Sequence, residues 1–448
     1  MLSLLKTKTP NFFFISFVIL AAFLCADSMI NWVTDLLVPQ LTSSSGIIFF
    51  IVLAIIYGYG AYVILSYAAD NTKEVREKNS YISKIHIVVI LTQVVLSAIL
   101  VYIISSIIIY SEYYTLGLLV TTIITESVTV IISILFAKTF FSWYKSNRNA
   151  IIVLLYGLSF AIGALAIIEI ESLEINALLK KEPVISPDTE VIFPSDEYEP
   201  GSFLRLFTDT YEYSNAAAFI LVLAATALLL YNYSNRLGRV KYWILILLPL
   251  VYYLSTLLDT LGVYNPETDS ELLYWYSYQS LNSTAGGILF GIAYWQVAKS
   301  VRQDSPVRNY LIIAAYGFVL YFITTQVGLI AASYPPFGFA VFAFLPLSFY
   351  LVFVGVYSSA ISVSQDNKLR SSIRKIATEN SNLLGSIGTA QMEQEIQRTV
   401  NSMKHVVQEE EKELEEQSGI EANLEEDEMK LYLEEVMQEV GKAKKPSV

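Results

Sequence analysis

Ten long apolar runs, separated by gaps of very different basic content, constrain this chain more than any other feature. Each run has roughly 19 to 25 residues, and a helix needs about 20 to cross a hydrocarbon core of about 30 Å. The hydrophobic share is 54% of 448 residues, which is too high for a water-soluble globule. We therefore predict an all-α fold, a polytopic transmembrane bundle of about ten helices. The predicted spans are 11–29, 46–68, 85–110, 116–138, 150–170, 214–232, 242–263, 279–299, 309–332 and 338–360.

Lysine and arginine are distributed unevenly between alternate gaps. One set of gaps holds 15 basic residues before the C-terminal tail: Lys6, Lys8, Lys73, Arg76, Lys78, Lys84, Lys138, Lys145, Arg148, Arg236, Arg239, Lys241, Lys299, Arg302 and Arg308. The other set holds Lys180, Lys181 and Arg205, all in one long gap. Because short cytoplasmic loops are enriched in Lys and Arg, we predict that both termini are cytoplasmic, in the cell (plasma) membrane.

The first run allows two interpretations. It follows Lys6 and Lys8 and ends near Cys25, so it is either a retained helix or a cleaved signal peptide. We favour retention because the residues around Cys25 make a poor cleavage site.

Two segments outside the predicted spans are acidic. Residues 171–213 hold ten acidic against three basic residues and several prolines, so we predict an external loop that caps the bundle or attracts cations. Residues 361–448 form a predicted cytoplasmic, helical, coiled-coil-like tail. Its apolar stripes recur at spacings of three and four: Met392, Ile396, Val400, Met403 and Val407, then Met429, Leu433, Val436 and Val440. We expect residues 390–440 to bind a cytoplasmic protein partner or a second copy.

Glu126 lies near the middle of the fourth predicted span, where an ionisable side chain is costly and suggests a function. Thr122, Thr129 and Ser133 follow it or precede it at helical spacing, so they share its face. The other predicted spans offer no basic residue at this depth to balance the carboxyl. Glu126 is therefore either a hydrogen-bonding group between helices or a contact for an ion, a proton or a ligand. Asp259, near the outer end of its span, is a further candidate for the same site.

Other kinds of chemistry find little support in the sequence. The single cysteine, Cys25, excludes an intrachain disulfide, and two histidines are too few for a histidine-rich metal site. Nucleotide-binding and metalloprotease motifs are missing. We predict a non-enzymatic protein with no catalytic residue, no cofactor, no metal site and no nucleic-acid partner.

Two stretches carry a resemblance to known proteins. Residues 333–338, Ser-Tyr-Pro-Pro-Phe-Gly, and the segment from Tyr357 to Gln394 resemble uncharacterised multi-span membrane proteins of ammonia-oxidising archaea, some of which look like sensory input modules. The resemblance, over residues 333–394, implies an archaeal cell membrane and supplies no ligand.

Three functions remain open. The long tail favours a sensory, signal-transducing or scaffold protein that acts through a cytoplasmic partner. A secondary transporter or ion-coupled carrier using Glu126 is the alternative. An accessory subunit of a membrane complex is the third, with the small-residue pair Gly287 and Gly291 on its packing surface.

Overall fold

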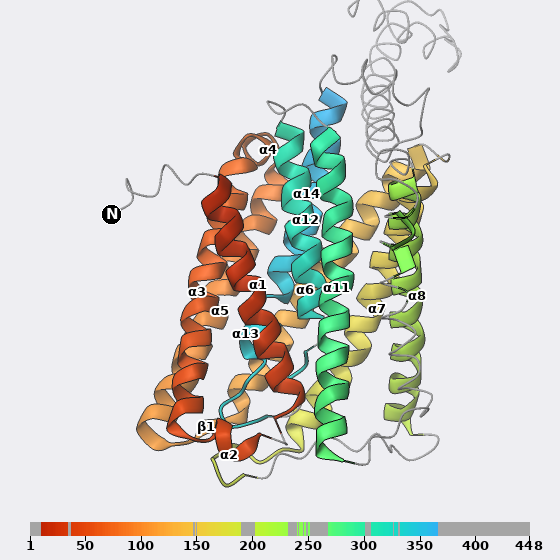
Figure 1. Cartoon of the computed structure of the whole chain (residues 1–448). Coiled ribbons are helices and arrows are strands. Elements are labelled where there is room, and N and C mark those ends of the chain that lie inside the picture. The colour runs from red at the N-terminus through yellow and green to blue at the C-terminus, as the bar shows by residue number, and fades with distance from the viewer. Residues whose placement is uncertain are drawn as a thin grey trace, which may run out of the picture.

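A computed structural model of the chain describes residues 10–34, 37–146, 148, 150–189, 202–231, 268–300, 306–325, 327–329 and 332–365, with scattered positions between 240 and 250. The described residues form a bundle of long, roughly parallel helices (Figure 1). The long helices are α1 (Pro10–Trp32), α3 (Ser44–Asn71), α5 (Ser80–Tyr110), α6 (Thr115–Ser146), α7 (Ile151–Leu179), α8 (Phe203–Tyr231), α11 (Asp269–Ser300), α12 (Pro306–Thr324) and α14 (Leu345–Gln365). The short elements are α2 (Val38–Leu41), α4 (Lys73–Lys78), α13 (Phe339–Ala343), β1 (Tyr113–Tyr114) and β2 (Val184–Ile185).

The prediction of an all-α helical bundle is confirmed. Eight segments of the described helices are long and apolar enough to cross a membrane, and they coincide with eight of the ten predicted spans. The predicted span 279–299 is also helical, as part of the more polar α11, which is not among the eight. The predicted span 242–263 and the tail beyond residue 365 lie outside the described residues.

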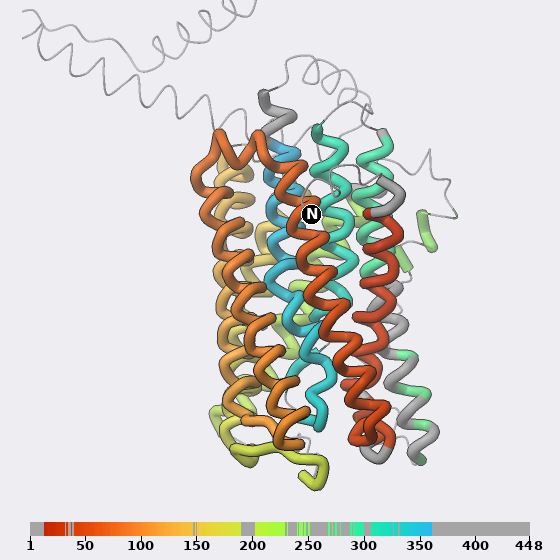
Figure 2. The backbone as a smooth tube through the Cα atoms, turned by 90° about the vertical axis from the view of Figure 1, so that its left-hand side faces the viewer, coloured from red at the N-terminus to blue at the C-terminus, as the bar shows by residue number. Residues whose placement is uncertain are grey.

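Helices α12 and α14 occupy the centre of the bundle. α1, α3 and α5 form one side of it and α8 the opposite side (Figure 1 and Figure 2). The apolar stretch that runs through α13 and α14 is buried along its whole length, whereas that of α8 is 28% buried. The lipid-facing residues are therefore on the outer helices, and the apolar stretch of α14 is packed against protein.

Glycines set the close spacing of the central helices. A Cβ atom on Gly291 would lie 2.6 Å from Val319 Cγ2, and one on Gly287 would lie 2.7 Å from Phe322 Cβ. The predicted packing role of Gly287 and Gly291 thus operates within the chain, between α11 and α12. Small residues of this kind let helix backbones approach in a membrane, where the hydrophobic effect between helices is absent.

The predicted span 309–332 ends too late, whereas 338–360 matches an apolar stretch, Phe339–Ala360, that α13 and α14 form together. α12 ends at Thr324, irregular backbone follows, and the chain resumes as α13 before α14 begins at Leu345. The side chain of Asp27 on α1 holds the start of α13, because its carboxylate accepts hydrogen bonds from the amides of Gly338 (2.9 Å) and Val341 (3.2 Å). Gly338 has a φ of +88°, a left-handed conformation that suits glycine.

This capping has a consequence for α1. A helix inside a membrane must satisfy its first amides internally, and Asp27 does so from a helix some 300 residues away in sequence. α1 also buries Phe13, Phe17, Leu20 and Leu24 against the bundle.

A short clasp closes one end of the bundle, which we call the β1 end. Tyr113 and Tyr114 of β1 pair antiparallel with Ile185 and Val184 of β2. Tyr113 is fully buried, and its hydroxyl donates a 2.6 Å hydrogen bond to the carbonyl of Ser333. Burial raises the pKa of Tyr113 well above its ordinary value, which keeps this donor protonated. Three connections, α5–α6, α7–α8 and α12–α13, thus meet at this end.

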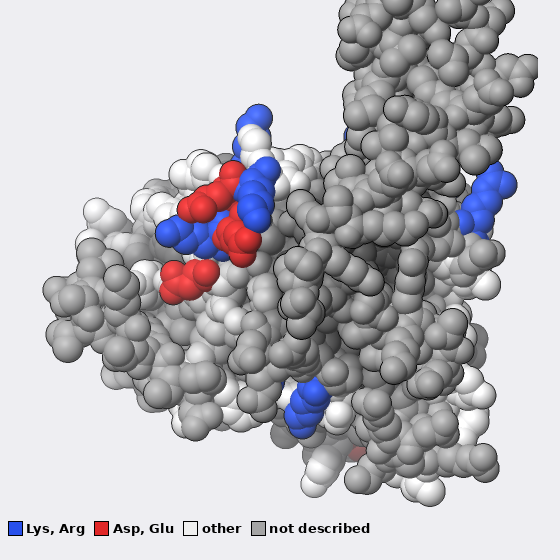
Figure 3. All heavy atoms as spheres, turned by 90° about the horizontal axis from the view of Figure 1, so that it is seen from above, with Lys and Arg blue, Asp and Glu red and all other residues white. Residues whose placement is uncertain are grey.

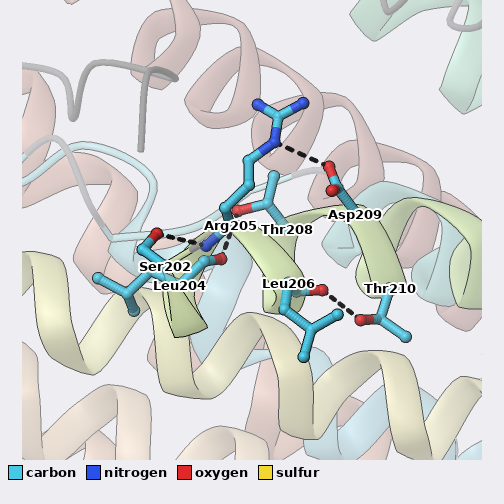
Figure 4. A network of polar contacts seen from close by, with 7 residues as sticks. All are labelled: Ser202, Leu204, Arg205, Leu206, Thr208, Asp209 and Thr210. Carbon is cyan, nitrogen blue, oxygen red and sulfur yellow. Dashed lines mark hydrogen bonds and ion pairs between the residues drawn. The ribbon is translucent and has the colours of Figure 1, made fainter. Parts of the chain in front are cut away.

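The predicted loop 171–213 is wrong at both ends, because α7 continues to Leu179 and α8 begins at Phe203. Ser202 starts α8 by accepting a 3.2 Å hydrogen bond from the amide of Arg205, and Arg205 pairs one turn later with Asp209 at 3.1 Å (Figure 4). Acidic residues that lowered the hydropathy of these segments, such as Glu171, Glu174 and Asp209, lie within the helices.

The opposite end, which we call the α4 end, carries charged side chains on α4. Figure 3 looks onto this end and shows acidic and basic groups close together. Lys78 pairs with Glu74 at 2.7 Å and Lys73 with Glu77 at 3.9 Å, all four side chains being exposed. Such exposed pairs contribute at most about 1 kcal/mol each.

Candidate functional site

The predicted polar face of α6 is buried. Thr122, Thr129 and Ser133 are 0% exposed and Glu126 is 2% exposed. Glu126 lies eleven residues into α6, about 16 Å from its first residue at 1.5 Å per residue. The carboxyl group is therefore deep in the bundle, where burial without a partner is costly.

The neighbouring helix α7 brings acidic groups to the same level. Thr115 donates its amide to the carbonyl of Pro183 at 3.0 Å, and Ser127 donates its hydroxyl to Glu171 at 3.0 Å, which fixes the antiparallel register of the two helices. Glu174, one turn beyond Glu171, is thereby level with the turn of α6 that precedes Glu126. Glu174 is 2% exposed.

The carboxyl groups of Glu126 and Glu174 are close enough to repel each other when both are ionised, and Glu171 adds to this repulsion at Glu126. The ion pairs of the described residues, Lys73–Glu77, Lys78–Glu74 and Arg205–Asp209, leave these two buried carboxyls without a basic partner. A countercharge at this site would therefore have to balance two carboxyl groups rather than that of Glu126 alone.

Irregular backbone completes the site. Glu174 accepts a hydrogen bond from the amide of Leu329, in the segment that follows α12. A Cβ atom on the preceding residue, Gly328, would overlap Glu174 Oε1 and lie 3.1 Å from its Cδ. Asn31 on α1 donates to the carbonyl of Gly328 at 3.4 Å. Non-helical backbone at membrane depth occurs where protein buries it or where it lines a polar cavity, and here it lies against a buried carboxyl.

Four oxygen atoms in this part of the bundle have no hydrogen-bond partner among the described residues. They are Glu126 Oε2, Glu174 Oε2, Thr122 Oγ1 and Thr125 Oγ1. Thr125 and Glu126 follow Thr122 on α6 at spacings of three and four residues. The three side chains therefore lie on one face over adjacent turns. Buried polar atoms are nearly always paired, so these four oxygens on adjoining turns of α6 and α7 have capacity to accept a further group.

The other residues of the predicted stripe have structural partners. Thr129 donates to the carbonyl of Thr125 at 2.6 Å, and Ser133 donates to the carbonyl of Phe160 at 2.8 Å. These bonds hold α6 to itself and to α7. The structure places Thr129 and Ser133 beside the site and leaves Thr122 and Glu126 as its open oxygens.

Aromatic side chains close the site toward the α4 end. Phe136 stacks on Phe140 with ring centroids 4.4 Å apart and packs against Phe160 at 4.1 Å and Phe353 at 5.6 Å. Trp143 continues the cluster beside Phe140 at 5.2 Å. This aromatic layer lies between the carboxyls and the α4 end. Glu174 lies nearer to the β1 end, where α7 finishes at Leu179, and the partly buried Glu171 lies one turn closer to the α4 end.

Sequence reasoning missed two residues of the site and proposed one that the structure does not describe. Glu174 was placed in the loop 171–213, and Thr125 was left out of the stripe. Asp259 lies outside the described residues. Glu169 lies on another face of α7 and accepts a hydrogen bond from Ser214 of α8.

The donor set of the site is made of oxygen atoms. Among the described residues, no group of three or more His, Cys, Asp or Glu side chains could hold a metal ion. His86, on α5, bonds instead to the hydroxyl of Tyr350 at 2.6 Å. The arrangement can hold protons on its carboxyls or a hard cation between carboxylate and hydroxyl oxygens.

Comparisons with known proteins found no relative. No protein-family model matches the chain, and no curated protein or solved structure matches it either.

Proposed function

We propose that this chain is an ion-coupled carrier of the cell membrane that takes up a proton or a small cation at Glu126 and Glu174. The carboxyl pair carries this proposal, because two buried acids share one place without a basic partner among the described residues. Ionisable groups inside a membrane bundle mark ion or proton pathways by default.

The interrupted helix beside the pair supports a carrier in particular. Carriers place their sites near the bilayer midplane, where broken helices expose backbone groups to the bound ion. Here α12 stops at Thr324 and the irregular residues 327–329 contact Glu174. A change in the charge of the Glu174 carboxyl changes the electrostatic force on residues 327–329, which helical hydrogen bonds do not hold in place.

The access route follows from the layering of the bundle. The aromatic layer around Phe136 blocks the α4 end, which the distribution of lysine and arginine assigns to the cytoplasm. We infer that the described conformation receives its ion from the external, β1 end, where Glu174 lies nearer than Glu171, and that transport requires a second conformation in which the aromatic layer opens.

A flux experiment tests this function. The full chain in liposomes, given an inward proton or cation gradient, is expected to acidify the lumen or accumulate the cation. Glu126→Gln and Glu174→Gln should each abolish this flux while leaving a folded protein. Glu169→Gln is the matched control, since Glu169 is also buried on α7 but faces α8. Equal flux in all three variants would exclude the carboxyl pair from transport.

A sensor that acts through the tail is the second candidate. The observation that favours it is the position of α14, which is buried along its apolar stretch and leads directly into residues 366–448. A rearrangement at the carboxyl pair would reach the predicted cytoplasmic tail through this helix. Deleting residues 366–448 should leave a carrier's flux largely intact and should abolish signalling by a sensor.

The accessory-subunit alternative gains no support from the glycine pair. Gly287 and Gly291 were its proposed packing surface, and both are covered by α12 of the same chain. The resemblance to sensor-like archaeal proteins favours the second candidate and identifies no ligand.

A further inference from the structure

We propose that Thr122, Thr125, Glu126 and Glu174 form a calcium-binding site. This deepens the proposed function and rests on the same carboxyl pair, but it names the ion. The inference stands on the behaviour of the two threonines, on the charge of the pair and on the lack of room for water.

The hydroxyl groups of Thr122 and Thr125 differ in their hydrogen bonding from those of other threonines in the bundle. Helical threonines in this chain donate their hydroxyl to the carbonyl four residues earlier, as the following pairs show: Thr92 to Val88 at 2.9 Å, Thr121 to Gly117 at 2.8 Å, Thr129 to Thr125 at 2.6 Å and Thr139 to Leu135 at 2.9 Å. Thr122 and Thr125 are as buried as Thr121, yet their hydroxyls make no hydrogen bond among the described residues. A buried hydroxyl that gives up the local bond costs about 1–3 kcal/mol unless something else takes it.

A proton would not use these hydroxyls. Protonation of Glu126 and Glu174 satisfies the carboxyls alone and leaves both threonine oxygens without a partner. A metal ion, in contrast, takes carboxylate and hydroxyl oxygens together. The threonines therefore distinguish a cation site from a simple proton site.

Charge and space select the ion. Two carboxylates carry two negative charges, which one divalent cation balances alone, whereas one sodium ion balances only one of them and requires a proton on the other carboxyl. Magnesium holds on to several waters and demands near-octahedral geometry, but the four residues here are at most 2% exposed. Zinc, copper and nickel favour sites with nitrogen or sulfur ligands, and manganese favours octahedral oxygen sites as magnesium does, whereas the donors here are four oxygen-bearing side chains. Calcium accepts six to eight oxygen ligands in irregular geometry, which leaves room for second carboxylate oxygens and backbone carbonyls.

Calcium-dependent thermal unfolding of the full chain in detergent tests this site. Calcium chloride is expected to raise the melting temperature in a saturable way, and magnesium, sodium and potassium chlorides at matched ionic strength are not. Thr122→Val and Thr125→Val should each weaken the apparent calcium affinity by about tenfold, since groups that support a bound metal typically contribute 10–100-fold. Glu126→Gln and Glu174→Gln should abolish the stabilisation.

Two control variants separate loss of a ligand from loss of packing. Thr121→Val is the matched control, because Thr121 is equally buried on the same helix but bonds to its own backbone. It should keep the calcium response of the unaltered chain. Thr122→Ser retains the hydroxyl and should also respond to calcium.

The outcomes distinguish this proposal from the carrier function. Calcium stabilisation that is lost in Thr122→Val and kept in Thr121→Val, with no flux in liposomes, supports the site and refutes the carrier. Proton flux that depends on Glu126, with no calcium response in the unaltered chain, supports the carrier and overturns the calcium site. An identical calcium response in Thr122→Val and the unaltered chain also overturns it.

Discussion

The carboxyl group of Glu174 occupies the space that a side chain on Gly328 would need. A Cβ atom on Gly328 would overlap Glu174 Oε1 and lie 3.1 Å from Cδ, and the adjacent amide of Leu329 donates to the same carboxylate. A buried acid on α7 and the unwound segment after α12, which are far apart in the sequence, are thus fitted to each other.

Gly328→Ala is expected to push Glu174 out of place. Overpacking of a filled site costs about 1–3 kcal/mol, so the melting temperature should fall by several degrees. Calcium stabilisation should weaken as well, because Glu174 would no longer face Glu126. Thermal unfolding with and without calcium measures both effects.

Gly58→Ala is the control for this substitution. Gly58 lies within α3 and a Cβ atom there would meet nothing within 4 Å. Because alanine suits a helix better than glycine, this variant should be unchanged or more stable by roughly 0.5–1 kcal/mol. A stable Gly328→Ala variant with full calcium response would show that the contact with Glu174 is not required.

Asp27→Ala should destabilise the start of α13. The substitution leaves the buried amides of Gly338 and Val341 without their acceptor, at a cost of about 1–3 kcal/mol for each group. Chemical denaturation in mild detergent would measure the loss. Asp70→Ala, at the exposed end of α3, should change stability by less than about 0.5 kcal/mol. Similar losses in the two variants would contradict a capping role.

Apolarity and periodicity predicted most of the membrane spans and one buried polar face. They located eight spans that the structure bears out, and the spacing of Thr122, Glu126, Thr129 and Ser133 identified a face that is fully buried. Both signals are local, since length against bilayer thickness and the helical repeat are properties of a single segment.

The residues that pack against that face of α6 could not be predicted from these local signals. Glu174 was assigned to a loop because Glu169, Glu171 and Glu174 lower the hydropathy at the end of α7, and the criterion for a span ended it at residue 170. The break after Thr324 was missed because its backbone groups are satisfied by distant residues, Asn31 among them. Neither the register of α6 on α7 nor the approach of Gly328 to Glu174 leaves a pattern in one sequence.

Gly355→Ala is expected to separate α12 from α14. A Cβ atom on Gly355 would lie 2.6 Å from the amide nitrogen of Ala314 and 2.7 Å from the carbonyl oxygen of Tyr310. These are backbone atoms and cannot turn away, so a helix must move, and the loss should reach or exceed the roughly 1–3 kcal/mol of ordinary overpacking.

Gly291→Ala offers the comparison. Its nearest neighbour is the side chain of Val319 at 2.6 Å, which can change rotamer, although the carbonyl of Ala315 at 3.0 Å limits the relief. Thermal unfolding should therefore rank Gly355→Ala below Gly291→Ala in stability. The reverse order would mean that α11 and α12, rather than α12 and α14, form the tightest contact.

Tyr113→Phe should weaken the clasp at the β1 end. The variant keeps the buried ring and removes the hydroxyl that donates to Ser333 at 2.6 Å, which leaves a buried carbonyl unpaired at a cost of about 1–3 kcal/mol. Tyr114→Phe alters the neighbouring residue of the same strand, which is 47% exposed, and should change stability by less than about 0.5 kcal/mol.

The pH dependence of the same pair gives an independent check. Burial raises the pKa of Tyr113 well above its ordinary value of about 10, so its contribution to stability is complete below about pH 10. Above that pH the unfolded chain loses this proton first, and the contribution declines as the pH rises toward the folded pKa. Unfolding measured between about pH 8 and pH 11 should therefore show a shallower alkaline decline for Tyr113→Phe than for Tyr114→Phe. Parallel curves for the two variants would place Tyr113 in contact with water and remove it from the clasp.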